Sequence, residues 1–200
     1  MKKPYLKKIR EINGLHVWYV DGMHVRKNIN EEFTNYGESY NFNFIPKNEV
    51  WIDKEFGKKE YNYYIKFSIA RNKLIKSGKT KEKALKQGEL IEQKERNKSK
   101  LVQKLKNLKN KKQIIKEIHK KLLRKYSNNK IKVWIVNGFL VRSIFFLDFT
   151  EGGHDKVYKF VPENEVWIDD ALNPKELKHV LIHELHERAL IKKGLSYNEA

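Results

Sequence analysis

The alternation of apolar and polar residues changes from a strand period to a helical period along the chain, and the whole pattern then occurs again. VWYV (residues 17–20) is followed by Asp-Gly and a further apolar stretch, which predicts a β-hairpin with a type I′ turn. Residues 40–44 alternate like a strand, and Pro46 ends them. EVWID (residues 49–53) predicts one more short strand.

Helical spacing of apolar residues follows these strands. We predict helix starts and ends from capping residues: Asn173, Pro174 and Glu176 start one helix, Thr80 and Ser196 cap others, and Gly78 and Gly194 end two. After Thr80 the helical pattern runs on into a long amphipathic stretch with apolar positions at Leu101, Leu105, Leu108, Ile115, Ile118 and Leu122.

The sequence matches itself without a gap when it is shifted by 116 residues. VWYVDGMHVR (residues 17–26) falls on VWIVNGFLVR (residues 133–142), and FIPKNEVWID (residues 44–53) falls on FVPENEVWID (residues 160–169). LIKSG (residues 74–78) likewise falls on LIKKG (residues 190–194). Agreement of this extent indicates an internal duplication. The second copy of the strand pattern has Asn137-Gly138 as its turn and residues 157–160 as its alternating segment.

These patterns predict an α+β protein made of two tandem repeats, each a small antiparallel hairpin or meander followed by helices. We place a degenerate N-terminal repeat at residues 1–79, a basic helical connector at residues 80–127, and a C-terminal repeat at residues 128–200. The C-terminal repeat ends at the position equivalent to Ala84, so we expect its second helix to be cut short.

The charge of the chain is concentrated in one segment. The formal net charge is +18. Residues 94–125, from Lys94 to Lys125, hold fourteen Lys or Arg and two acids, so we assign most of the charge to the connector. A basic segment of this kind is attracted to phosphate backbones, which predicts non-specific nucleic-acid binding. A solvated linker helix is the alternative interpretation.

Other functions are limited by what the composition lacks. The chain has no Cys, so a metal would have to be held by His and carboxylates. No apolar run reaches the length of a membrane span, and residues 1–14 have no apolar signal core. We therefore expect a cytoplasmic protein with no membrane partner.

The two repeats differ where the second one carries titratable groups. The sequence HELHE (residues 183–187) replaces FSIAR (residues 67–71). His183 and Glu187 are four residues apart and would share one face of a helix, as two ligands of one metal ion do. Glu184, between them, would be the catalytic acid/base. A surface ion pair between His183 and Glu187 is the competing interpretation.

Two protein ligands do not make a stable zinc site, so a third is expected. His154, in the loop TEGGHDK, is our first choice, and His179, one turn before His183, is the second. Gly152 and Gly153 permit unusual backbone angles in that loop. An ordinary surface turn would explain the same residues.

The motifs FVPENEVWIDD and VLIHELHERALIKKGLSYNEA resemble a group of small, largely uncharacterised phage and microbial proteins that look like a zincin-type metallopeptidase module. The resemblance covers roughly residues 133–200. It implies zinc, with His183 and Glu187 as ligands and Glu184 as acid/base. The pattern of that group continues from Tyr-x-x-Ala to a His, whereas this sequence ends at Ala200. If that His is a ligand, we expect weakened metal binding.

Three functions therefore compete. The first is a zinc-dependent hydrolase acting on a peptide or protein substrate, with its site in the C-terminal repeat. The second is a non-catalytic nucleic-acid-binding or structural protein that uses the basic connector. The third is a pure scaffold, a pseudo-dimer with Trp18, Trp51, Trp134 and Trp167 as core anchors, in which chelators leave the melting temperature unchanged.

Overall fold

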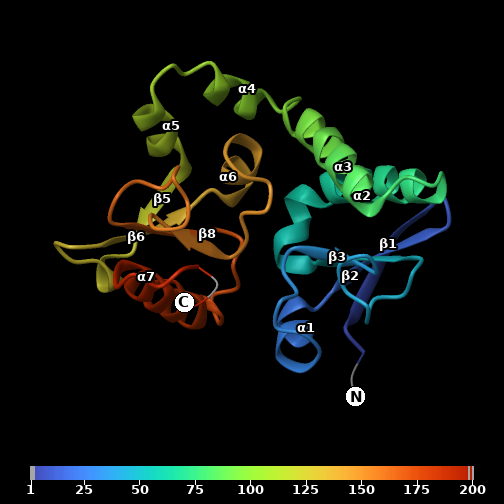
Figure 1. Ribbon diagram of the computed structural model, residues 1–200, viewed down its shortest axis with the longest axis horizontal. Coiled ribbons are helices and arrows are strands. Elements are labelled where there is room, and N and C mark those ends of the chain that lie inside the picture. Colours follow the sequence, from blue (N-terminus) through green and yellow to red (C-terminus); the bar gives the residue numbers. More distant parts are fainter. Residues whose placement is uncertain (1–2, 198, 200) are drawn as a thin grey trace. The chain divides into compact units, whose positions relative to one another are not determined.

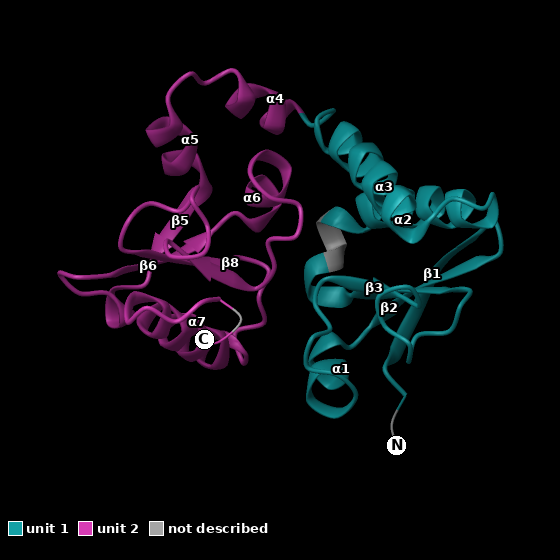
Figure 2. Ribbon diagram, in the orientation of Figure 1, with its two compact units in different colours: residues 1–99 teal, residues 100–200 magenta. Residues whose placement is uncertain are grey.

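The chain forms two compact units, residues 1–99 and residues 100–200. The computed structural model describes residues 3–197 and 199, apart from the side chains of residues 57–59. Figure 1 shows the elements of the chain, and Figure 2 colours the two units separately. Each unit has mixed α+β structure, with helices packed on its own four-stranded sheet.

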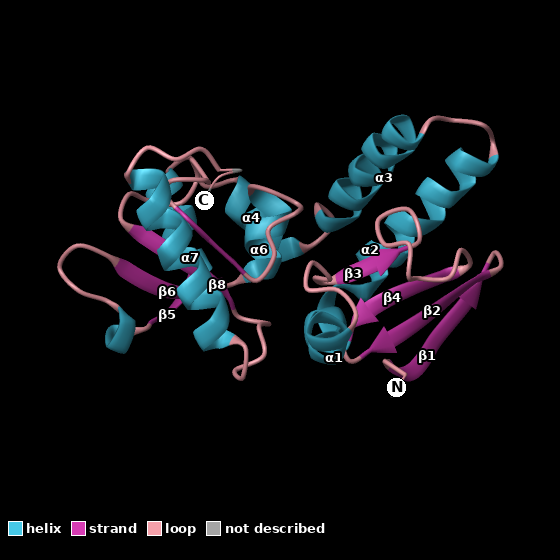
Figure 3. Cartoon of the chain, turned by 60° about the horizontal axis from the view of Figure 1, so that its bottom comes forward, coloured by secondary structure: helices cyan, strands magenta, loops and turns pink. Residues whose placement is uncertain are grey.

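The two sheets have the same strand order. In unit 1 the order is β1-β2-β4-β3, and the strands are β1 (Tyr5–Ile12), β2 (Leu15–Val20), β3 (Tyr36–Glu38) and β4 (Glu49–Asp53) (Figure 3). In unit 2 the order is β5-β6-β8-β7, and the strands are β5 (His119–Leu122), β6 (Lys132–Val136), β7 (Gly152–His154) and β8 (Glu165–Asp169). The central strands pair in parallel and the outer ones antiparallel.

Helices cover both sheets. Unit 1 contains α1 (Gly22–Asn28), α2 (Lys54–Lys76) and α3 (Lys81–Arg96). Unit 2 contains α4 (Lys100–Lys106), α5 (Lys111–Ile118), the 3-10 turn η1 (Arg124–Tyr126), α6 (Gly138–Ile144) and α7 (Leu177–Lys192). Trp51 and Trp167 are buried in the two cores, whereas Trp18 and Trp134 are only partly buried. The strands predicted at EVWID and the first strand of each predicted hairpin are confirmed as β4, β8, β2 and β6. Strands β1, β3, β5 and β7 were not predicted, and His154, which was expected in a loop, is the last residue of β7.

The predicted type I′ hairpins are wrong, because the Asp-Gly and Asn-Gly pairs begin helices α1 and α6. Asp21 Oδ1 accepts a hydrogen bond from the N–H of His24 at 3.1 Å. Asn137 Oδ1 accepts one from the N–H of Leu140 at 3.2 Å. Both residues are therefore N-caps, a role for which Asp and Asn are well suited. The chain then crosses over before it returns, which is what parallel pairing of β2 with β4 requires.

The glycine of each pair is needed for space rather than for a left-handed turn. A Cβ atom on Gly22 would lie 1.8 Å from Asp53 Oδ2, and one on Gly138 would lie 2.0 Å from Asp169 Oδ2. Both aspartates are buried and ion-paired, Asp53 with Arg26 at 3.0 Å and Asp169 with Arg142. The carboxylate at the end of β4 or β8 thus packs directly on the first residue of the short helix.

We expect Gly138→Ala to destabilise the protein by about 2–3 kcal/mol, since the new methyl group overlaps a carboxylate that Arg142 holds in place. Urea unfolding measures the change. Gly14→Ala is the control: Gly14 has φ +76° and no atom near its added Cβ, so only backbone strain of about 1 kcal/mol is expected. Equal losses in the two variants would contradict a steric role for Gly138.

The alternating segments at residues 40–44 and 157–160 are not strands, contrary to the prediction. The N–H of Phe42 donates to Glu38 O at 3.0 Å, and the N–H of Tyr158 donates to His154 O at 3.0 Å, so both segments turn. Their aromatic rings pack on the central tryptophans. Phe44 lies 5.8 Å from Trp51, centroid to centroid, and Phe160 lies 5.9 Å from Trp167. The alternation of ring and polar residues therefore reflects packing of a loop.

The long helical connector predicted at residues 80–127 is divided between the two units. Its first part is α3, which packs on α2 within unit 1. The remainder forms α4, α5, β5 and η1 of unit 2. Asn110 caps α5, and Ile118 accepts a hydrogen bond from the N–H of Asn137 at 2.8 Å. Pairing of β5 with β6 thus ends the helical run that the sequence pattern predicted to continue.

The predicted helix ends agree with the structure better than the predicted helix starts do. Gly78 and Gly194 have φ of +84° and +103° directly after α2 and α7, as predicted. Thr80 caps α3. Helix α7 begins at Leu177, later than predicted, because Asn173 to Glu176 form a separate turn. Ser196 hydrogen-bonds Glu199, and the rest of the helix predicted there includes residues 198 and 200, which lie outside the described part of the chain.

Within the described residues, none of the helices combines the length and the apolar character that crossing a bilayer would require.

Candidate metal centre

Helix α7 presents a mixed apolar and charged face to the sheet of unit 2. It packs against β7 and β8. Its buried residues are Val180, Leu181, Glu184 and Arg188. Val180, Leu181 and Arg188 each lie three or four residues from Glu184, so the four positions form one stripe of the helix. The carboxylate of Glu184 therefore points toward the sheet, and only 8% of the residue is exposed.

Strand β7 leaves room for this carboxylate because it begins with two glycines. A Cβ atom on Gly152 would lie 3.0 Å from Glu184 Oε1. A Cβ atom on Gly153, on the opposite side, would lie 2.6 Å from the ring of Tyr158. The next residue, His154, has a fully buried side chain at the end of the strand. The Gly-Gly-His sequence thus brings the imidazole and the helix carboxylates together.

Three side chains meet between β7 and α7. Ligand atoms of His154, Glu184 and Glu187 all lie within 4.8 Å of one another, as the donors around one metal ion must. His154 Nε2 is 2.9 Å from Glu187 Oε2. On the other side of the ring, Nδ1 accepts the N–H of Lys156 at 3.2 Å. This tautomer places the proton on Nε2, which donates to Glu187.

Burial sets the protonation of the group. The pKa of Glu184 is raised to about 8 by burial and, to a smaller extent, by the negative charges of Glu187 and Glu151. Burial also lowers the pKa of His154, and the attraction of Glu187 only partly offsets it. Without a further cation, the group at neutral pH therefore holds a neutral imidazole and a protonated Glu184.

Arg188 fixes the loop that follows His154. Its Nε donates to Asp155 Oδ1 at 2.5 Å, and its Nη2 donates to Asp155 Oδ2 at 3.1 Å and to Asn164 Oδ1 at 3.0 Å. Burial of Asp155 opposes ionisation, but the bonds from Arg188 and the backbone of Asn164 lower its pKa to about 2. Arg188 is thus committed to Asp155 and does not neutralise Glu184.

The structure brings together Glu187, His154 and Glu184, but it leaves His183 outside. His183 is exposed, as are His179 and His186. The buried stripe of α7 is centred on Glu184, and Glu187 lies at its edge with 12% of its side chain exposed. His183 is rotated beyond that edge. The predicted pair of ligands on one face, with Glu184 beside them, is therefore replaced by His154, Glu184 and Glu187.

No family model matches the chain, and no curated protein or solved structure matches it either.

Unit 1 has an ion pair at the equivalent place, with the charges exchanged. Glu38 stands 116 residues before His154, and Arg71 stands 116 residues before Glu187. Arg71 Nη1 donates to Glu38 Oε1 at 3.0 Å and to Asn41 Oδ1 at 2.5 Å. Both members of the pair are buried. In unit 1, helix α2 thus places the cationic side chain of Arg71 beside the buried carboxylate of Glu38.

The space beside this pair is also filled in unit 1. Tyr36 replaces Gly152, and Ser68 replaces Glu184. The Tyr36 ring stacks on Tyr64 with centroids 4.3 Å apart and lies edge-on to Phe67 at 5.8 Å. An aromatic ring and a hydroxyl therefore occupy the volume that holds a carboxylate in unit 2. The alignment of HELHE with FSIAR contained the exchange of Ser68 for Glu184, whereas the exchange of Tyr36 for Gly152 was not predicted to bear on the site.

Proposed function

We propose that unit 2 binds a divalent metal ion through His154, Glu184 and Glu187, and that the protein is a metal-dependent hydrolase. The observation that carries the proposal is the burial of Glu184. Among the described residues no hydrogen-bond donor or basic group contacts its carboxylate, and its charged neighbours are two more carboxylates. A buried carboxylate in this position must stay protonated or gain a cation.

The contrast with unit 1 supports this. There Arg71 forms an ion pair with Glu38 and opposes the effect of burial, which raises the pKa of Glu38 to about 7, whereas in unit 2 two carboxylates face a neutral imidazole without a cation from the helix. Imidazole nitrogen and carboxylate oxygens suit zinc as well as other first-row divalent ions, and zinc is the ion to test first. Coordination through Nε2 of His154 requires its proton to move to Nδ1, so the contact with the N–H of Lys156 would be lost.

For the reaction we propose hydrolysis of a peptide or amide bond. A zinc ion held here would lower the pKa of a bound water. With Glu184 as a ligand, we assign the role of proton acceptor to Glu151, whose charge acts on Glu184. Glu151 has φ +54°, and the other described non-glycine residues with positive φ are two asparagines. Such a backbone outlier beside a candidate site supports a functional role.

We further propose that the two units derive from one duplicated ancestor, of which unit 2 kept the metal site and unit 1 replaced it by an ion pair. The shared strand order and the equivalent cap and glycine positions support this proposal.

The ligand assignment is tested by zinc titration of chelator-treated protein against a competing dye. We expect His154→Ala and Glu184→Gln to weaken binding by about 100-fold or more, since each removes a direct ligand. His183→Ala is the matched control, because it removes an exposed imidazole from the same helix. Its affinity should stay within about threefold of wild type.

Two results would reject the assignment: no zinc binding by the wild-type protein, or losses in His183→Ala as large as in His154→Ala. The catalytic half of the proposal has its own test. Zinc-loaded protein should cleave unfolded casein, and Glu151→Gln should abolish cleavage while zinc binding remains. Zinc binding without cleavage of any peptide or amide substrate would support the metal site and reject the proposed hydrolase activity.

A further inference from the structure

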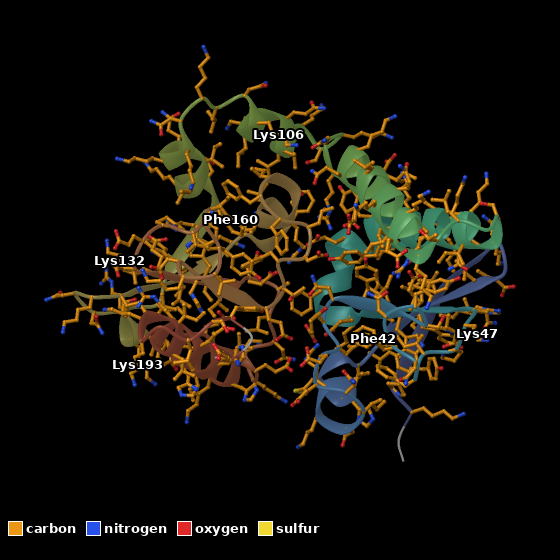
Figure 4. All side chains as sticks on the ribbon, in the orientation of Figure 1. Phe42, Lys47, Lys106, Lys132, Phe160 and Lys193 are labelled. Atoms are coloured by element: carbon orange, nitrogen blue, oxygen red, sulfur yellow. The ribbon has the colours of Figure 1, made fainter. Side chains whose placement is uncertain are left out.

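The densest positive charge of the protein lies on one part of unit 2 that the metal centre does not use. Residues 100–132 contain thirteen Lys or Arg and one acid, Glu117, and all thirteen basic residues are exposed. They belong to α4, α5, β5, η1 and the adjoining loops. In Figure 4 the side chains of this segment project outward, with Lys106 labelled on α4 and Lys132 at the start of β6.

The structure changes which residues of the basic segment are available to a partner. Arg96, within the range that the sequence predicted, is fully buried between Glu60 and Glu92. Lys98 pairs with Glu95 at 2.6 Å. In contrast, Lys104, Lys109, Lys112 and Lys116 make no ion pair with any described residue. Most of the unpaired charge of the predicted segment therefore lies in unit 2, from α4 onward.

The apolar sides of these helices already have a partner. Val102 and Leu105 of α4 and Ile118 of α5 are fully buried in the core that surrounds Trp167. Ile114 and Ile115 pack against the same core. Leu101, at 42%, is the one large apolar side chain that is exposed in this stretch. The surface therefore offers lysines without an apolar face, which does not suit insertion into a lipid bilayer.

We infer that this basic surface, residues 100–132, binds the phosphate backbone of nucleic acid. Unpaired lysines contact phosphates and release counterions, and this supplies affinity without sequence specificity. Exposed amide side chains are interleaved with the lysines at Asn107 and Gln113, and amides suit phosphate and sugar contacts. The inference does not depend on the metal centre, because β5 and β7 are opposite edges of the sheet.

The test is fluorescence anisotropy of a short labelled DNA duplex and a short labelled RNA of random sequence. For the wild-type protein we expect affinity to fall about 1000-fold between about 50 and about 200 mM salt. Changing Lys104, Lys109, Lys112 and Lys116 together to Gln should weaken binding about 100-fold at the lower salt and make the salt slope shallower by about 3.

The control variant changes the same number of exposed, unpaired lysines in unit 1, namely Lys47, Lys79, Lys83 and Lys86, to Gln. Lys47 is labelled in Figure 4. The net charge falls equally, so an effect within about twofold of wild type would locate binding on unit 2. Equal losses in both variants would overturn the inference, because diffuse charge would then explain binding.

Vesicles of neutral lipid with a fraction of phosphatidylserine serve as the second probe. Lysine-dependent binding to these vesicles without binding to DNA or RNA would also overturn the inference. Circular dichroism and zinc titration of both variants should match wild type, since the substituted lysines are exposed and distant in the sheet order from His154. If the unit 2 variant binds nucleic acid weakly and zinc normally, the result supports nucleic-acid binding by the basic surface, whether or not the protein is a hydrolase.

Discussion

Glu184→Gln is expected to stabilise the metal-free protein near pH 9 by about 2–4 kcal/mol. The pKa of Glu184 in the folded state is about 8, against an ordinary value of 4.5, and the main cause is burial. Above pH 8 the native protein must hold a buried negative charge beside Glu187 and Glu151. A neutral amide of the same shape removes that cost.

The sign of the pH dependence follows from the direction of the shift. Between pH 4.5 and about 8 the native state binds more protons at Glu184 than the unfolded state does. The stability of the wild-type protein therefore falls as pH rises through this window and levels off above it. The advantage of the variant should be absent below pH 4.5 and largest above pH 8. Urea unfolding in the presence of a chelator, repeated across this range, measures it.

Glu163→Gln is the matched control, because Glu163 is an exposed acid of the same unit that makes no ion pair with a described residue. It should change stability by no more than about 0.5 kcal/mol at any pH. With saturating zinc the order should reverse, since wild type gains binding energy that the Gln variant lacks. A pH-independent loss of stability in Glu184→Gln would show that the carboxylate is satisfied within the protein.

Arg96→Met is expected to destabilise unit 1 by about 3–5 kcal/mol. Arg96 is fully buried at the end of α3, where Nη1 lies 2.6 Å from Glu60 Oε2 of α2 and Nη2 lies 2.7 Å from Glu92 Oε1. The guanidinium also faces the rings of Tyr63 and Tyr64. Removing it leaves two buried carboxylates without their cation, while the apolar stem is largely kept.

Urea unfolding of unit 1 measures this loss, and two further variants identify its cause. Lys98 lies two residues after Arg96 and forms an exposed ion pair with Glu95. Exposed ion pairs contribute little to stability, so we expect Lys98→Met to change the free energy of unfolding by at most about 1 kcal/mol. Adding Glu60→Gln and Glu92→Gln to Arg96→Met should restore most of the stability. Failure of this rescue would mean that packing of the guanidinium matters more than its charge.

The contacts of Arg96 also explain why the connector predicted at residues 80–127 does not form a segment separate from the two units. Four residues, Tyr63 and Tyr64 of α2 with Glu92 and Arg96 of α3, tie the two helices together inside unit 1. The sequence pattern of α3 looks solvated, because its buried positions include Glu92, Arg96, Ala84 and Gly88. Charged residues that are buried in pairs cannot be recognised from hydrophobic spacing.

The candidate site was predicted in part. All three residues were selected from the sequence, His154 and Glu187 as metal ligands and Glu184 as the catalytic acid/base. The error concerned the orientation of α7. Apolar residues surround that helix on several sides, so its periodicity does not choose between a face with His183 and a face with Glu184. The stripe formed by Val180, Leu181, Glu184 and Arg188 becomes evident only when the sheet is present.

By itself the sequence determined the features that depend on neighbouring residues or on repetition. These are the EVWID strands, the glycine ends of α2 and α7, the cap at Thr80, and the contrast between HELHE and FSIAR. Local backbone sterics and capping bonds are enough to produce them. The tertiary structure decided what depends on distant partners. Parallel pairing of β6 with β8 requires a crossover, in which Asn137-Gly138 starts a helix instead of forming a hairpin turn. Pairing with β6 makes residues 119–122 a strand, and packing on β7 selects the inward face of α7. Burial and charge balance among residues far apart in the chain determine these outcomes, and no local pattern encodes them.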